Sequence, residues 1–216
     1  MADVRGNGAV GLRERKKQRT RTMLIDAAVR LCERQGFERT TVDQIAAIAD
    51  VSPRTFSRYF PTKDAIGLAL IDEALDKAAV ELARQPLDLN PFEALRRAYV
   101  AMYHTTKSAP PGELSAERML CIVRIVMTSP SLREAAMEYR AHPVSVVLAE
   151  RMGVASDDRR VKLVSSVWAS LIMTAVGDLA DENVDWARLS VDDIVFRVET
   201  TFAEFTDLMT EVVQPV

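Results

Sequence analysis

The possible folds of this chain are narrowed above all by residues 40–63, which read TTVDQIAAIADVSPRTFSRYFPTK. Thr41 and Gln44 match a capping box, so a helix of roughly eight residues is expected to begin at Thr41. A tight break follows, and Ser52 with Pro53 is a favoured start for a second short helix. Two short helices joined by a turn of about three residues predict a helix-turn-helix.

The second of these helices has one apolar face and one polar face. Phe56 and Phe60 stand four residues apart and therefore share the inner face. The side chains expected to point outward are Pro53, Arg54, Ser57 and Arg58, with Thr55 at the edge. A guanidinium can bind guanine through two hydrogen bonds, and small hydroxyls and apolar atoms suit other base edges. The helix is therefore a candidate for DNA readout, and the alternative is an ordinary short surface helix.

The remainder of the chain has helical periodicity, without an alternating strand pattern or an internal repeat. Together with the two helices above, about nine helices are expected, the others over 12–35, 62–84, 91–107, 114–127, 131–153 with a kink at Pro143, 157–181 and 191–213. The sequence therefore predicts an all-α protein. Residues 1–11 are expected to be a flexible tail, 12–64 a three-helix DNA-binding domain and 65–216 a second helical domain.

Charge is distributed unevenly along the chain. Residues 1–64 contain 13 Lys and Arg against 8 Asp and Glu, whereas residues 65–216 contain 15 against 23. A basic head on an acidic body is typical of a protein that binds nucleic acid at one end. The basic run between Arg13 and Arg21 either contacts phosphates and the minor groove or solubilises a frayed helix end.

The pattern F-x-x-T-T-V-D-Q-I-A-x-x-A-D-V-S-x-R-T-F-x-R-Y-F-x-x-K resembles the DNA-binding segment of TetR-family transcriptional regulators over about residues 20–66. The resemblance implies that Thr41, Tyr59 and Lys63 contact phosphates. It also implies that bases are faced by Pro53, Arg54, Thr55 and Ser57, and the neighbouring Ser52 and Arg58 complete the expected DNA-binding set.

The resemblance further implies that residues 65–216 bind a ligand and form the dimer. The helices over 91–107, 114–127 and 131–153 are expected to enclose a small hydrophobic effector. Candidate walls are the apolar and aromatic side chains Tyr99, Met102, Tyr103, Met119, Val123, Met127, Met137 and Trp168, which as an alternative form plain core. The segment from Arg118 to Arg133 is similar to actinobacterial family members that sense long-chain acyl groups, so such compounds are candidate effectors.

Arg124 is a further candidate ligand residue because it interrupts the apolar run 120–127. A buried arginine requires an anion, either an internal carboxylate or an acidic ligand. An arginine on the outer edge of this helix would instead be exposed to solvent.

The last two helices, over 157–181 and 191–213, are apolar on more than one side, so each is expected to pack on two sides. The resemblance implies that they pair with their mates in a four-helix homodimer interface. The alternative is packing within one protomer.

The expected function is a ligand-responsive regulator, a repressor that binds a palindromic operator as a dimer. An enzyme is not expected, because His104 and His142 are isolated and no phosphate loop or nucleophile elbow is present. No catalytic residue, metal or cofactor is therefore predicted. Two cysteines in apolar helical patterns and no apolar run of about 20 residues favour the cytoplasm over a membrane. A helical protein-binding adaptor is the alternative, which the basic head disfavours.

Overall fold

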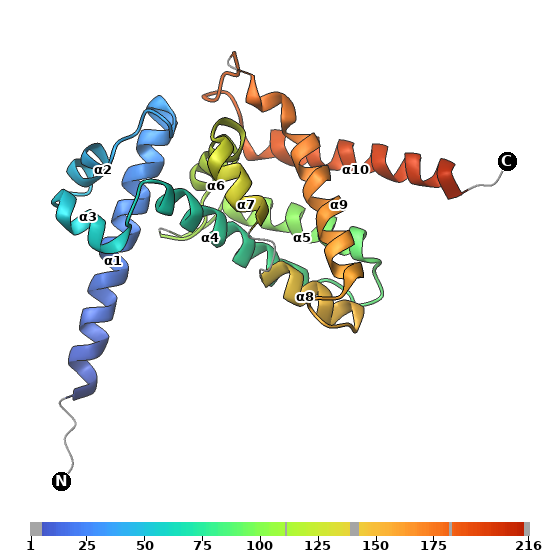
Figure 1. Cartoon of the computed structure of the whole chain (residues 1–216), viewed down its shortest axis with the longest axis horizontal. Coiled ribbons are helices and arrows are strands. Elements are labelled where there is room, and N and C mark those ends of the chain that lie inside the picture. Colours follow the sequence, from blue (N-terminus) through green and yellow to red (C-terminus); the bar gives the residue numbers. More distant parts are fainter. Residues whose placement is uncertain (1–5, 111, 139–142, 182, 214–216) are drawn as a thin grey trace, which may run out of the picture. The chain divides into compact units, whose positions relative to one another are not determined.

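The computed structural model describes residues 6–110, 112–138, 143–181 and 183–213, and their side chains except those of 6–12, 137–138 and 212–213. Every regular element in these ranges is a helix (Figure 1), as the sequence predicted. The elements are α1 Gly6–Gln35, α2 Val42–Ile48, α3 Pro53–Tyr59, α4 Asp64–Ala83, α5 Pro91–Thr106, α6 Ala116–Thr128, α7 Pro130–Glu138, α8 Pro143–Met152, α9 Arg159–Ala175, the 3-10 helix η1 Gly177–Ala180 and α10 Val191–Val213. The chain divides into two compact units, Met1–Ile66 and Gly67–Val216.

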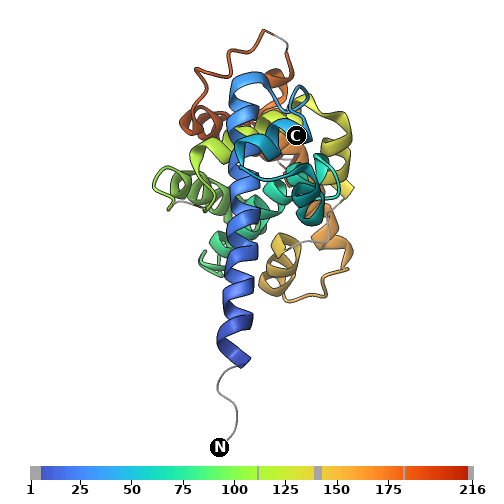
Figure 2. The same cartoon turned by 90° about the vertical axis from the view of Figure 1, so that its left-hand side faces the viewer.

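The first unit is built on α1, against which α2 and α3 pack. Leu24, Ala28 and Ile45 are fully buried between these helices. Phe56 and Phe60 are also buried, with ring centroids 6.0 Å apart, on the inner face of α3 where their spacing placed them. The N-terminal half of α1 extends beyond the other two helices of this unit (Figure 2).

Local signals in the sequence set the ends of these helices. Gly36 has a φ of 82° and its N–H donates to the Cys32 carbonyl, so it ends α1 in the left-handed conformation that glycine tolerates. The capping box of Thr41 and Gln44 is present at the start of α2. Asp50, in the turn before α3, has a φ of 52°, a region that Asp tolerates better than most residues.

The second unit is a bundle of α4 to α10. Its helices pack as α10 on α9 and α5, α6 on α7, and α8 on α9. Leu70, Leu95, Ile125 and Leu148 are among its fully buried side chains. No helix in the described part of the chain is both long and apolar enough to cross a membrane.

A buried ion pair joins α4 to α6 in this bundle. Arg118 on α6 places Nη1 2.8 Å from both carboxylate oxygens of Glu73 on α4. The same nitrogen donates to the Gly112 carbonyl at 3.1 Å. The Arg118 side chain is only 5% exposed, so acceptors such as these stabilise its charge.

Several expected boundaries differ in the structure. Gly6 to Gly11 continue α1 instead of forming a tail, and residues 1–5 lie outside the described residues. The single kinked helix expected over 131–153 is two helices, α7 and α8. Pro130 and Pro143 each occupy a first helical position, where a proline lacks only an N–H that would be unpaired anyway. Asp158 caps α9.

Candidate nucleic-acid interface and effector cavity

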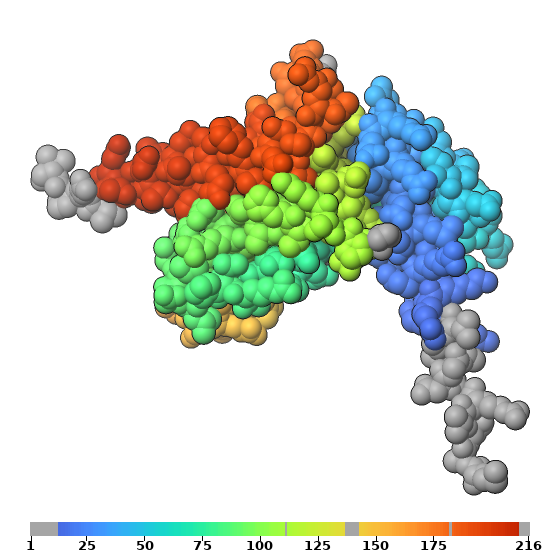
Figure 3. All heavy atoms as spheres, turned by 180° about the vertical axis from the view of Figure 1, so that it is seen from behind, coloured from blue at the N-terminus to red at the C-terminus, as the bar shows by residue number. Residues whose placement is uncertain are grey.

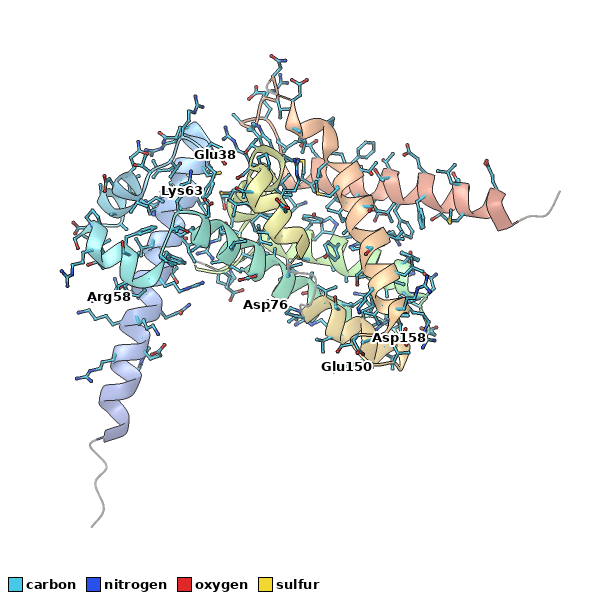
Figure 4. The ribbon with its side chains drawn as sticks, in the orientation of Figure 1. Glu38, Arg58, Lys63, Asp76, Glu150 and Asp158 are labelled. Atoms are coloured by element: carbon cyan, nitrogen blue, oxygen red, sulfur yellow. The ribbon has the colours of Figure 1, made fainter. Side chains whose placement is uncertain are left out.

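The exposed face of α3 carries the side chains predicted to reach DNA. Ser52, Pro53, Arg54, Ser57 and Arg58 are exposed, whereas Thr55 is half-buried at the edge. Arg58, labelled in Figure 4, lies on this helix in the first unit. The buried Phe56 and Phe60 hold the other face, so the orientation of α3 within its unit leaves both guanidinium groups in solvent.

The hydroxyl groups of this face are partly engaged in the helix itself. Ser52 Oγ accepts from the Thr55 N–H at 3.1 Å and lies 3.0 Å from Thr55 Oγ1. Ser57 Oγ donates to the Pro53 carbonyl at 3.1 Å. Ser52 and Thr55 therefore stabilise the start of α3, and Ser57 keeps oxygen lone pairs that can accept from a base.

Tyr59, at the end of α3, is half-buried against α1. A hydrogen bond with Thr20 is the main cause that lowers its pKa, and a hydrogen bond with Arg58 acts in the same direction. The Arg58 guanidinium lies 5.2 Å from the centre of the Tyr59 ring. These contacts orient a phenol hydroxyl that can donate to a phosphate.

Lys63 has an internal role that the sequence did not reveal. Its Nζ donates to the carbonyls of Phe37 and Glu38 at 3.1 and 3.3 Å and lies 4.8 Å from the Phe37 ring centre (Figure 4). Two of its three donors are thus used to hold the loop after α1. Thr41 Oγ1 accepts from the Gln44 N–H, so its own hydrogen is left to donate to a phosphate.

An exposed basic surface continues from α3 along α1. Arg21 lies over the Phe60 ring, 5.2 Å from its centre. The exposed basic side chains of the preceding turns are Arg13, Arg15, Lys16, Lys17 and Arg19. Such a surface is suited to phosphate contacts.

The second unit contains a cavity of about 230 Å³ bounded by α4 to α9. Its walls are mostly apolar. The residues predicted to bind an effector that line it are Tyr99, Met102, Tyr103, Met119, Val123, Met127 and Trp168. Other walls come from Ile71, Ala74 and Leu75 on α4 and from Ile172 and Met173 on α9.

The expectation that Arg124 faces the cavity is wrong. Arg124 is absent from the lining, and its guanidinium lies 5.5 Å from the centre of the Trp186 ring. The other lining residues of α6 follow Met119 by 3, 4, 7 and 8 positions, and Arg124 lies off that stripe. The side chain of Met137 lies outside the described residues.

Arg133 on α7 is the arginine that lines the cavity, and it was not among the residues predicted from the sequence. Ala136, one turn later, lines the cavity as well. No periodic signal in the short α7 identifies this face, because its inward side is set by α6, on which it packs.

Polar groups in the cavity wall are few and incompletely paired. Ser165 Oγ and Trp168 Nε1 are buried without a hydrogen-bond partner. Burial raises the pKa of Tyr99 to about 12, and the nearby Trp168 side chain reduces this rise. The Trp168 N–H lies near the Tyr99 hydroxyl without forming a hydrogen bond to it. Burial also raises the pKa of Tyr103. Both phenols are therefore neutral at physiological pH.

Comparison with known proteins places these features in one family. The family model for bacterial regulatory proteins of the tetR family matches residues 24–70. The transcriptional regulator TcmR of Streptomyces glaucescens is 36% identical over 157 residues, which cover 68% of this chain and 67% of TcmR. The chain belongs to the TetR family.

Other TetR-family proteins are more distant. The regulator EthR of Mycolicibacterium smegmatis is 28% identical over 167 residues, 74% of each chain. Among solved structures, SmeT, a repressor from Stenotrophomonas maltophilia, aligns with a TM-score of 0.53 at 18% identity over 85% of this chain and 89% of its own. A TetR regulator from Rhodococcus sp. RHA1 gives 0.53 at 15% identity, covering 87% and 97%. These two structures support the fold.

TetR-family regulators are ligand-responsive DNA-binding proteins that control transcription, mostly as repressors, and they act as homodimers. Membership therefore favours DNA binding over the adaptor alternative. The relatives are transcriptional regulators and not enzymes. Within the described residues, no group of three His, Cys, Asp or Glu side chains is arranged to hold a metal ion.

The last two helices of this TetR chain divide their surfaces between core and solvent. Trp168 and Val198 are buried, so Trp168 belongs to the protomer core and the cavity wall and is not on the outer face. Besides charged residues near the helix ends, the outward positions include Leu163, Ser170 and Thr174 on α9 and Phe196, Thr200 and Ala203 on α10. These small or apolar side chains leave two uncharged stripes, and the C-terminal half of α10 extends beyond its neighbours in the bundle (Figure 3).

Proposed function

We propose that this chain is a dimeric repressor that binds a near-palindromic operator through α3 and is released by a small hydrophobic effector. The observation that carries the DNA-binding part is the exposed Arg54 and Arg58 pair on a helix whose other face is fixed by Phe56 and Phe60. Two such helices related by a two-fold axis would meet successive major grooves about 34 Å apart. A cytoplasmic location follows from the proposed DNA target.

Arg54→Ala should weaken binding to the selected operator by about 5- to 150-fold and relax preference at one base pair per half-site, since a bidentate contact to guanine contributes about 1–3 kcal/mol. The measurement is a fluorescence-anisotropy titration with the operator recovered by in vitro selection, repeated with each base pair changed. Affinity for random DNA should change much less.

Arg188→Ala is the matched control, because Arg188 is an exposed arginine in the connection between η1 and α10, outside α3, and its replacement removes the same charge. It should leave operator affinity and base preference unchanged. If Arg54→Ala behaved like this control, α3 would not be the reading helix. If neither wild type nor control showed a steep salt dependence, the DNA-binding function itself would be excluded.

The proposed response to effector operates through α4. This helix starts in the DNA-binding unit and continues into the second unit, where Ile71, Ala74 and Leu75 form part of the cavity wall. An effector that prefers one position of α4 changes the affinity for DNA. By thermodynamic linkage, operator DNA must weaken effector binding by the same factor, about 5- to 150-fold.

Long-chain acyl compounds are the first class of effector to test, because residues 118–133 are similar to the corresponding segment of acyl-sensing family members.

A further inference from the structure

The charge of the cavity is set by one side chain. Among the described residues that line it there is no aspartate or glutamate, and Arg133 is the single formally charged group. Tyr99 and Tyr103 stay neutral because burial raises the pKa of each. The cavity therefore presents a positive charge to whatever enters it, and no carboxylate among its described lining residues neutralises that charge.

Arg133 has no internal partner in the described structure. Its backbone N–H donates to the Ser129 carbonyl, but its guanidinium makes no hydrogen bond or ion pair with any described residue. Other arginines of the same unit are used internally: Arg118 binds Glu73, and Arg151 donates to the carbonyls of Gln85 and Pro86. A half-buried guanidinium at an apolar cavity is stabilised by an anion, so Arg133 is suited to bind an anionic group of a ligand.

Two polar atoms of cavity-lining residues on α9 are also buried without hydrogen-bond partners. Trp168 Nε1 can only donate a hydrogen bond, it is buried at the cavity wall, and it has no acceptor. Ser165 Oγ is buried without a partner as well. Leaving such groups unpaired costs about 1–3 kcal/mol each, and an oxygen-bearing ligand would remove that cost.

We propose that the effector is an amphipathic acid, with an apolar body among α5, α6 and α9 and an anionic end bound by Arg133. This inference rests on the proposed function of the cavity as the effector site and specifies its ligand class. A neutral hydrocarbon of the same length would fill the apolar part and leave Arg133 without an anion. Selectivity for the acid is therefore built into the wall.

The test compares decanoate with decan-1-ol, which share the same alkyl chain length and differ in charge. Calorimetric titration of the full-length protein should give an affinity about 10- to 100-fold higher for decanoate, the range expected for a hydrogen bond to a charged group. Arg133→Met should remove this preference by weakening decanoate binding alone. Arg133→Lys, which keeps the charge without the planar fork, should retain part of it.

Arg124→Met is the matched control, since Arg124 is an arginine of the neighbouring helix that does not line the cavity. It should bind both probes as wild type does. Equal binding of acid and alcohol by wild type, a preference that survives Arg133→Met, or binding of neither probe would each overturn the inference. A thermal unfolding scan of Arg133→Met establishes that the variant is folded.

A second experiment adds decanoate or decan-1-ol to the preformed protein–operator complex and measures release of the operator. Its outcome separates this inference from the proposed function. If decanoate binds through Arg133 and does not release the operator, the ligand class stands and the proposed release is wrong. If acid and alcohol release the operator equally well, the proposed function stands and the recognition of an anion is wrong.

Discussion

Phe196→Glu should convert the dimer into monomers and abolish specific operator binding. Phe196 is 72% exposed in the protomer, and it begins the uncharged stripe of α10 that continues through Thr200 and Ala203. In the proposed four-helix interface the new carboxylate would be buried against apolar groups without a partner. Because a monomer reads only one half-site, operator affinity should fall toward the non-specific level, a loss of about 10³-fold or more.

Sedimentation velocity at micromolar concentration measures the first effect and operator titration the second. Leu87→Glu is the matched control, because Leu87 is an apolar side chain that is 78% exposed in the connection between α4 and α5. That variant should remain a dimer with unchanged operator affinity. A Phe196→Glu protein that sediments as a dimer would place the interface elsewhere.

Glu73→Ala should lower the free energy of unfolding of the second unit by at most about 3–5 kcal/mol, since it removes a carboxylate from the buried Arg118 charge. The Arg118 side chain is 5% exposed, against 26% for Glu73, so losing the carboxylate costs more than losing the guanidinium. Urea unfolding followed by circular dichroism gives the value, and the slope with denaturant shows whether the unfolded states are comparable.

Two further variants test the cause of that loss. Combining Glu73→Ala with Arg118→Met should recover much of the stability, because the buried guanidinium that lost its Glu73 acceptor is then replaced by an apolar side chain. Asp178→Ala breaks the pair of Asp178 with Arg197, whose side chains are 64% and 30% exposed, and should cost at most about 1 kcal/mol. Equal losses for Glu73→Ala and Asp178→Ala would show that burial of Arg118 does not determine the energy.

The helix-turn-helix could be predicted in detail because its signals are local. A capping box at Thr41, a glycine in the left-handed region at Gly36 and an N-cap at Ser52 each act within four residues, and the structure contains all three. The spacing of Phe56 and Phe60 then fixed which face of α3 is exposed. The role of Lys63 depended on carbonyls 25 and 26 residues away and could not be inferred from such signals.

The cavity was predicted less completely because it depends on how helices face one another. The apolar stripe of α6 identified Met119, Val123 and Met127, whereas Arg124, which was also a candidate, lies off that stripe in the structure. Arg133 was missed because the sequence indicated one kinked helix over 131–153, whereas the structure has two helices, and the inward side of the short α7 is a tertiary property.

The position of Trp168 gives the protein an intrinsic optical signal. Its indole lines the cavity, meets the Tyr99 ring at a centroid distance of 5.2 Å and meets Phe202 of α10 at 6.2 Å. The fluorescence of this residue therefore depends both on what occupies the cavity and on how α10 packs. Trp186, the other tryptophan of the chain, lies under Arg124 away from the cavity, so Trp186→Phe would leave Trp168 as the sole emitter. Its emission would then report effector entry and rearrangement of α10 in real time, without an attached dye.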